Sequence, residues 1–295
     1  MHWVWQVVGT FLAVAALVDA FQTIFHPTER GTISDAVGLV VWRTSQTISR
    51  QWKNVLTWAG PIAVLAIIVM WVSLIVLGFA LIYWPRLDNS FSYANPADHG
   101  RHHALLDAIN LSLDSVITMT GDISPNSAWM RLIMGFEAAF GFGILTASIS
   151  WILSIYPILE RRRSLAHSAI LLRDVLSSGG QLTAEFAKAA LATFAQQLVT
   201  LRSDFLHFPV TFYFHEQTER SGLGSAFSFL KCLSRWAESE NADPSLRTAG
   251  TLLSVALNDV VKLLADYAGV SFESPEHAIG ELTKEHLRDE PERAA

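Results

Sequence analysis

The sequence predicts an all-α membrane protein with three transmembrane helices, a re-entrant helix that enters the membrane without crossing it, and an all-helical cytoplasmic domain. Residues 60–84 form a run of 25 residues without a charge, and residues 3–25 and 130–159 form two further apolar runs. From residue 164 onward, apolar residues instead recur at helical spacing among polar ones. The composition agrees, because 51% of the 295 residues are hydrophobic and the mean hydropathy is +0.32.

Residues 1–28 are expected to hold an extra N-terminal transmembrane helix, over the apolar run 3–25. No basic region precedes the run and no A-x-A site follows it, which does not fit a cleaved signal peptide. Asp19 is the ionisable residue in this run, and such a residue inside a span is a functional candidate, for example as a proton-sensitive or cation-coupled site. The favoured interpretation is plainer: Asp19 reaches the interface or pairs with a basic residue such as Arg43.

Residues 29–59 are expected to form an amphipathic helix in the membrane surface, because apolar residues recur at helical spacing from Ile33 to Ile48 with basic residues between them. An ordinary amphipathic connector has the same pattern. The outer helix follows at 60–84, with Trp58 and Trp84 at its two ends as interface anchors.

Basic residues predict the orientation. Arg30, Arg43, Arg50 and Lys53 follow the first span, and an arginine triplet at 161–163 follows the last one. Because Lys and Arg near span ends mark the cytoplasmic side, we expect a multi-pass protein of the inner cell membrane. Its N-terminus would lie outside, and its C-terminal domain would be cytoplasmic.

A short apolar helix at 105–119 precedes a polar turn at 120–125. About 15 residues of helix rise about 22 Å, which is too short for a hydrocarbon core of about 30 Å. Such a segment fits a re-entrant element, whose backbone must be covered by protein or line a water-filled path. The alternative is a buried helix and loop of a soluble core, which the neighbouring apolar runs disfavour.

The run from Ser115 to Thr120, followed by Gly121-Asp122-Ile123-Ser124-Pro125, resembles the pore-loop signature of the potassium-channel family. That signature reads S-V-x-T-x-T-T-V-G-Y-G-D-[IL]-x-P, and the T-V-G-Y at its centre is missing here. The resemblance covers residues 60–160 and implies a pore domain with an outer helix (60–84), a pore helix (105–119), a filter (118–122) and an inner helix (130–159). It also implies a homotetramer in membrane lipid.

The implied selectivity filter is Thr118, Met119, Thr120, Gly121 and Asp122. Four missing residues remove up to about 13 Å of extended chain, which is most of a stack of carbonyl rings. Four copies of Asp122 would form an acidic ring that attracts cations; alternatively, Asp122 supports the filter from behind. We therefore expect a permeant monovalent or divalent cation with weak potassium selectivity, and no cofactor.

The inner helix carries the remaining candidate residues. By resemblance, Arg131 and Glu137 support the filter. Glycines permit close packing or bending, so Gly141 and Gly143 are the expected hinge. Near Pro157, the residues expected to close a dewetting gate are Ile155, Tyr156 and Leu159. Hydroxyls that could face a wet cavity belong to Ser148, Ser150 and Ser154.

Residues 161–295 are expected to form the cytoplasmic helical domain. One apolar stripe runs from Phe186 to Phe205 and another from Leu253 to Tyr267. Helix ends are predicted at Gly179-Gly180, and helix starts at Asp243-Pro244 and Ser274-Pro275. Residues 209–214 (PVTFYF) are a candidate strand. The domain is expected to assemble or gate the pore.

The functional prediction is a tetrameric cation channel and not an enzyme, since H-E-x-x-H, G-x-S-x-G and paired carboxylates within spans are all missing. The alternative is a non-conducting, channel-like sensor or adaptor that signals through its cytoplasmic domain. Nucleic acid is not an expected partner, because there is no dense basic stripe with aromatics. A metal site is left open: the run ADHGRHH at 97–103 contains imidazoles but no regular ligand spacing.

Overall fold

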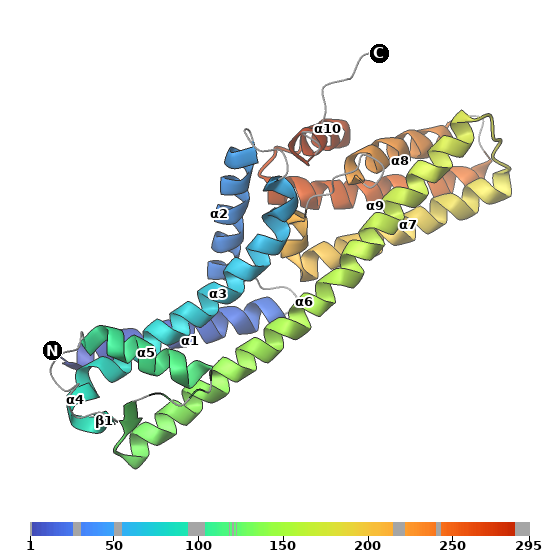
Figure 1. Ribbon diagram of the computed structural model, residues 1–295. Helices are drawn as coiled ribbons and strands as arrows, with labels where there is room; N and C mark the ends of the chain where they lie inside the picture. Colours follow the sequence, from blue (N-terminus) through green and yellow to red (C-terminus); the bar gives the residue numbers. More distant parts are fainter. Residues whose placement is uncertain are drawn as a thin grey trace. The chain divides into compact units, whose positions relative to one another are not determined.

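The structure, a computed structural model, describes residues 2–25, 31–49, 55–93, 104–117, 119, 121, 123–214, 222–239 and 243–286 (Figure 1). The chain divides into two compact units. Unit 1 comprises Met1–Val41 and Ala63–Leu153, and unit 2 comprises Trp42–Ile62 and Ser154–Ala295. Helices dominate both units.

Unit 1 contains α1 (His2–Phe25), the first part of α2 (Thr32–Ser49) and most of α3 (Val55–Tyr83). The chain continues through a 3₁₀ turn, η1 (Trp84–Arg86), the short α4 (Leu87–Ser90), β1 (Phe91–Tyr93), α5 (Ala104–Val116) and β2 (Ile123–Pro125). The long α6 (Ala128–Ser177) begins in this unit. The expected N-terminal, outer and pore helices thus correspond to α1, α3 and α5, although α5 ends three residues earlier than predicted.

The helices α1 and α3 touch through two glycines. A Cβ atom added to Gly9 would lie 2.3 Å from the backbone oxygen of Gly78, and one added to Gly78 would lie 2.7 Å from the backbone oxygen of Gly9. No side chain fits there, so the backbones meet directly, as small residues allow between membrane helices. The rings of Trp5 and Trp84 also pack, with centroids 5.3 Å apart.

The strands β1 and β2 form an antiparallel pair that brackets α5 in the sequence. Phe91 pairs with Pro125 and Tyr93 with Ile123, and the backbone nitrogen of Asn126 donates to the oxygen of Ser90 (2.8 Å). The chain therefore leaves α4 and re-enters α6 at one place. Three-residue strands give little periodicity to read, which is why the sequence analysis did not anticipate them.

In unit 2, α7 (Ala184–His207), α8 (Leu223–Ala237), α9 (Pro244–Ala268) and α10 (Pro275–His286) pack around a core that also includes α6 (Figure 1). The predicted helix starts at Pro244 and Pro275 and the helix end near Gly179, where φ is +89°, are confirmed. The stripe on α9 is buried up to Leu264 and half-buried at Tyr267, whereas Phe186 at the start of the other stripe is exposed.

The predicted strand at 209–214 is wrong: Pro209–Tyr213 form a 3₁₀ helix, η3. Proline at its first position fixes a helical φ and cannot donate to a sheet. The Thr211 backbone nitrogen and Oγ1 both bind the oxygen of Phe208 (3.0 and 2.6 Å), which favours a turn over an extended chain.

The predicted end of the inner helix at 159 is also wrong, because α6 continues past Pro157 to Ser177 as one helix of 50 residues. Its buried stripe runs on without a break through Ile158, Leu165 and Ala169. Packing along this stripe offsets the backbone hydrogen bond that proline removes. The expected boundary at 160/161 therefore falls within a helix.

Among the described residues, four helices are long and apolar enough to span a membrane, namely α1, α3, α6 and α9. The apolar residues of α9 include Leu253, Leu257, Val260 and Val261, which are buried in the core of unit 2. A helix that is buried on several sides is as apolar as a membrane span. The apolar composition of α9 is therefore explained by its place in the core of unit 2.

Candidate functional site

The candidate site is built on α5, a helix of 13 residues that is packed against α3 and α6 (Figure 1). Ala108, Leu111 and Val116 are buried, while Leu106 and Leu113 remain exposed. Where α5 ends, it lies directly on α6: a Cβ atom on Gly141 would be 2.8 Å from Val116 Cγ1 and 2.9 Å from the Val116 oxygen. Gly141, one of the two expected hinge residues, thus permits close contact between these helices. Gly143 faces open space.

Glu137 on α6 lies behind α5 and is fully buried. The Tyr83 hydroxyl at the end of α3 donates to Glu137 Oε2 (2.6 Å), and the Ser112 hydroxyl of α5 is in hydrogen-bond contact with Oε1. Ser112 also donates to the backbone oxygen of Val76 in α3 (3.0 Å). A carboxyl group in the middle of three helices therefore holds the short helix in place.

Ser112 has one hydroxyl hydrogen but faces two oxygens, those of Val76 and Glu137. All three groups are satisfied together only when position 137 presents a donor toward Ser112 and an acceptor toward Tyr83. A side chain at position 137 that can both donate to Ser112 and accept from Tyr83 should therefore preserve these hydrogen bonds, and one that cannot should lose them.

The expected filter begins where α5 ends. The Met119 backbone nitrogen donates to the oxygen of Asp114 (2.8 Å), and this residue is 63% exposed. A Cβ atom on Gly121 would be 2.1 Å from Asp114 Oδ2, so a larger residue at position 121 would require this carboxylate to move. Thr118, Thr120 and Asp122 lie outside the described residues, as does the histidine run at 99–103.

Arg131 and Glu137, which were expected to support the filter together, occupy different surroundings. Arg131 is exposed, and its Nε donates weakly to the backbone oxygen of Pro125 at 3.5 Å. Arg131 thus contacts the end of β2, whereas Glu137 contacts α5 and α3. Their roles toward the filter stay predictions.

The predicted gate needs correction. Ile155 and Leu159 are only 3% and 8% exposed, so they are packed inside the chain and do not face a shared pore. Tyr156 is 66% exposed and alone among the three is placed to meet another copy or lipid. Burial along the α6 stripe, which the sequence analysis did not assign, decides these orientations.

The hydroxyl candidates also separate: Ser148 is buried, while Ser150 and Ser154 are exposed. The two exposed serines belong to a stripe of small or hydroxyl side chains on α6, spaced three or four residues apart. We call this the small face of α6: Gly135, Ala139, Gly143, Thr146, Ser150 and Ser154, all of them exposed. A second exposed face carries large apolar side chains: Phe142, Leu145, Ile149 and Leu153.

Asp19 on α1 is buried and accepts hydrogen bonds from the start of α2. Ile33 N donates to Oδ1 (2.8 Å), Ser34 N donates to Oδ2 (3.2 Å), and the Ser34 hydroxyl donates to the same oxygen. Trp71 Nε1 of α3 adds a fourth donor (2.8 Å). A carboxylate at a helix N-terminus satisfies amides that have no partner within the helix.

Within the described residues, Asp19 therefore binds donors on α2 and α3 instead of reaching the interface or pairing with Arg43, which is exposed. Asp19 stands out in the sequence as an ionisable residue in an apolar run, but its donors come from other helices and are brought to it by tertiary packing.

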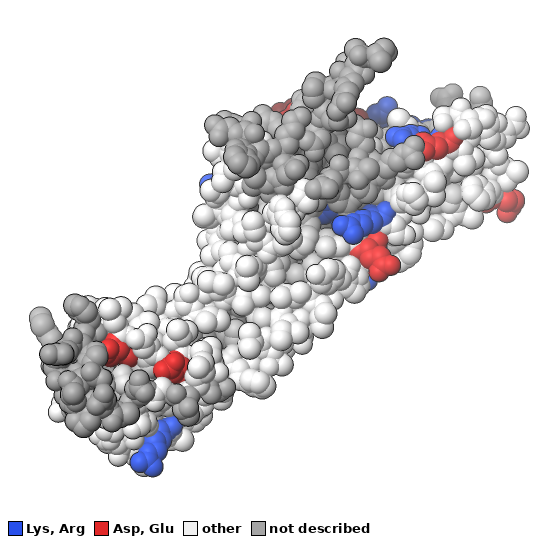
Figure 2. All heavy atoms as spheres, viewed as in Figure 1, with Lys and Arg blue, Asp and Glu red and all other residues white. Residues whose placement is uncertain are grey.

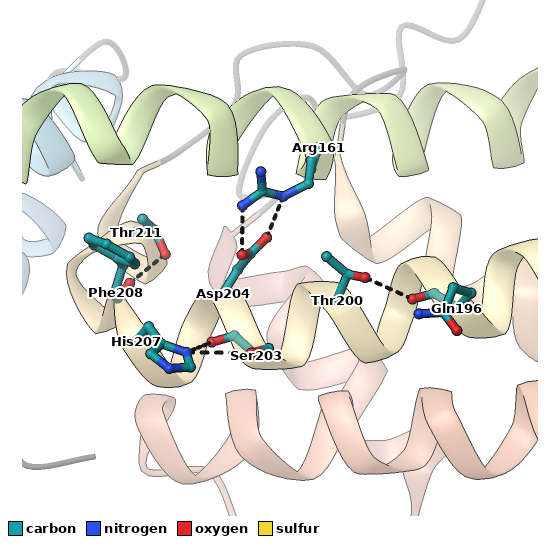
Figure 3. Close-up of polar contacts among 8 residues, drawn as sticks. All are labelled: Arg161, Gln196, Thr200, Ser203, Asp204, His207, Phe208 and Thr211. Carbon is teal, nitrogen blue, oxygen red and sulfur yellow. Dashed lines mark hydrogen bonds and ion pairs between the residues drawn. The ribbon is translucent and has the colours of Figure 1, made fainter. Parts of the chain in front are cut away.

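The face of unit 1 seen in Figure 2 has few charged side chains, apart from the atoms drawn in grey. Charge appears where α6 continues into unit 2. There Arg161 binds both carboxylate oxygens of Asp204 on α7, from Nε (2.9 Å) and Nη2 (2.7 Å) (Figure 3). This bond raises the pKa of Arg161.

Metal ligands were also considered. Among the described residues, no three His, Cys, Asp or Glu side chains lie close enough together to hold a metal ion.

The chain matches no protein-family model and no solved structure. It is 27% identical over 170 residues to a protein of Bacillus subtilis (strain 168) described as the uncharacterized membrane protein YdjJ. The aligned part is 56% of this chain and 48% of the relative, so the chain matches about half the length of that protein. With its long apolar helices, this similarity identifies the chain as a helical, multi-pass membrane protein.

Proposed function

We propose that the protein is a homotetrameric cation channel, similar to potassium channels, that conducts through the shortened filter Thr118–Asp122. One observation carries the proposal: α5 is a helix too short to cross a membrane, it is buried on one side against α3 and α6, and it ends directly before this turn. Thirteen residues rise about 20 Å, against a hydrocarbon core of about 30 Å. The permeant ion is a monovalent or divalent cation, with weak potassium selectivity.

The contacts of α5 support a re-entrant element. A helix that stops inside the membrane leaves backbone groups unsatisfied unless protein or water covers them. The polar side chains of α5 that point inward have partners: Ser112 binds Val76 and Glu137, and Ser115 binds the backbone oxygen of Met134 (3.2 Å). The end of α5 thus keeps a defined position against α6.

We assign the lining of the permeation path to the small face of α6. Its residues are exposed in the single chain and offer hydroxyls at Thr146 and Ser150, whereas the large apolar face suits lipid or a neighbouring copy. Around a four-fold axis, this small face leaves room for water.

In this proposal three helices, α1, α3 and α6, span the inner membrane. The N-terminus lies outside, and unit 2 lies largely in the cytoplasm. The arginines at 161–163 follow the third span and support this orientation.

The proposal is tested by reconstituting the full-length protein in liposomes and measuring isotope flux of potassium, sodium, calcium and magnesium. Asp122→Asn should lower cation flux or divalent block, because it neutralises the acidic ring. The matched control is Asp259→Asn, which removes an exposed carboxylate of unit 2 that pairs with Arg202. Absence of flux from the native protein would refute conduction. Flux and block unchanged by Asp122→Asn would assign Asp122 to support of the filter.

The lining is tested by thiol accessibility in a Cys232→Ser background. A cationic thiol reagent should block flux through Thr146→Cys and leave Leu145→Cys conducting, since these neighbours lie on the small face and the large apolar face. Block of Leu145→Cys alone would reverse the assignment of the two faces.

The second candidate is a non-conducting sensor or adaptor. It is favoured by the missing T-V-G-Y and by the large independent core of unit 2. A native protein that is folded and tetrameric in liposomes but passes no cation would support this second candidate.

A further inference from the structure

A short segment of unit 2, Phe208–Phe214, contacts the helices that enter this unit and the helical bundle. We call it the joint; it consists of η3 with one flanking residue at each end. Its residues Val210, Thr211 and Phe212 are buried.

The joint holds α6 through a buried arginine. Arg162 Nη1 donates to the backbone oxygen of Thr211 (3.2 Å), and both residues are buried. Next to it, Arg161 forms the two-fold bond to Asp204 at the end of α7 (Figure 3). Two successive arginines therefore fix α6 to the end of α7 and the middle of η3.

The joint also holds α2 and α3. The ring of Trp42 lies 5.9 Å from that of Phe212 and 5.8 Å from that of Tyr213. On α3, a Cβ atom added to Gly60 would lie 2.5 Å from the ring of Phe214 and 2.9 Å from its Cα. Glycine is therefore needed for this approach, because part of the obstacle is backbone.

On its other side the joint rests on the bundle. The ring of Phe212 meets that of Tyr267 on α9 edge-on, at 6.0 Å and 85°. The Tyr267 hydroxyl donates to the backbone oxygen of Phe205 (3.1 Å). Displacement of α9 or α7 must therefore reach η3, because interiors packed in this way transmit strain.

The helices held by the joint are those that belong to both units. The boundary between the two units falls between residues 41 and 42 in α2, between 62 and 63 in α3, and between 153 and 154 in α6. Trp42 and Gly60 lie within one turn of these points, and Arg162 lies about two turns beyond the third. Each helix is thus fixed close to where it passes from one unit to the other.

We propose that the joint is a coupling device by which the conformation of the bundle sets the position of α6 and, through it, the rate of conduction. Arg162 and Gly60 are its positioning residues. The part that concerns conduction rests on the proposed function, whereas the mechanical coupling to α6 does not. A change in the bundle acts on α2, α3 and α6 together, because the joint contacts all three.

The test is Gly60→Ala in full-length protein in nanodiscs and liposomes. The matched control is Gly280→Ala on α10, where an added Cβ atom would meet nothing within 4 Å. Gly60→Ala should raise deuterium uptake in α6 over 154–177. It should also change total flux about fivefold or more at unchanged relative ion flux, the usual range of coupling between sites. Gly280→Ala should change neither.

Phe214→Ala in the Gly60→Ala background should restore part of the native exchange of α6, because it removes the ring carbons that the new methyl group meets at 2.5 and 2.6 Å, while the Cα at 2.9 Å stays. If Gly60→Ala does not fold, Arg162→Lys is measured instead, with the same two readouts expected to change. Native deuterium uptake of α6 in the variants of Gly60 and Arg162 would overturn the coupling. Altered deuterium uptake together with altered relative ion flux would also overturn it, because that combination would indicate general damage to the protein. A native protein without flux refutes the proposed function only, since exchange still decides the coupling.

Discussion

Two substitutions of Glu137 should differ in their effect on stability, because only one of them keeps the hydrogen bonds of this site. Glu137→Gln places an amide where the carboxyl group lies, so its nitrogen can donate to Ser112 while its oxygen accepts from Tyr83. Ser112 then keeps its hydrogen for Val76. Glu137→Ala removes both contacts and leaves the Tyr83 hydroxyl buried without its acceptor.

The magnitudes follow from these contacts. Hydrogen bonds between membrane helices contribute about 0.6–1.7 kcal/mol each, and a buried hydroxyl left without a partner costs about 1–3 kcal/mol. Glu137→Ala should therefore lower the free energy of unfolding by about 2–4 kcal/mol. Glu137→Gln should change it by less than about 1 kcal/mol.

Both variants can be measured by titrating the protein from mild-detergent micelles with a denaturing detergent, following helix content. Tyr83→Phe serves as a third variant, since it removes one donor without leaving a buried hydroxyl. If Glu137→Gln is as destabilising as Glu137→Ala, an ionised carboxylate is required at position 137, and the claim that this side chain donates to Ser112 is wrong. An alanine variant of native stability would show that Glu137 does not hold α5.

Three further outcomes are expected. Asp19→Ala should lower the free energy of unfolding by about 2–4 kcal/mol in the same titration, because Trp71 and the first amides of α2 lose their acceptor; a loss below about 0.5 kcal/mol would contradict this. Gly141→Ala should cost about 1–3 kcal/mol, because its methyl group meets the α5 backbone, and native stability would mean that α5 is not pressed against α6. The hydrogen bond from Arg235 (2.6 Å) lowers the pKa of Glu276, so the pair stabilises unit 2 above the pKa of the unfolded carboxyl and stops doing so as the pH falls through the folded value. The melting temperature of the native protein should accordingly be higher than that of Glu276→Gln at neutral pH, and this difference should vanish in acid.

Much of the helix content could be predicted from the sequence, because long apolar runs and strong helix-end signals are local. The start of α9 at Pro244 and the turn at Gly179 depend on one or two residues each. The end of α6 was missed because the arginines at 161–163 indicate a membrane boundary, and a membrane boundary need not end a helix.

The site was only partly predictable. The short length of α5 and the special position of Glu137 can be recognised from the sequence, but the partners of Glu137 come from residues 25 and 54 positions away. The contact between Gly9 and Gly78 shows the same limit, since each glycine alone is unremarkable in an apolar run. Which residues of α6 are exposed, and hence the correction at Ile155 and Leu159, depends on packing that no local pattern records.

The pairing of β1 with β2 has a consequence for how this protein tolerates change. The pairing holds together the two ends of the segment that contains α5 and the turn. Insertions or deletions between β1 and β2 change the length of this segment without shifting the register of α3 or α6. A shorter turn is thereby accommodated locally, and the large helices keep their neighbours.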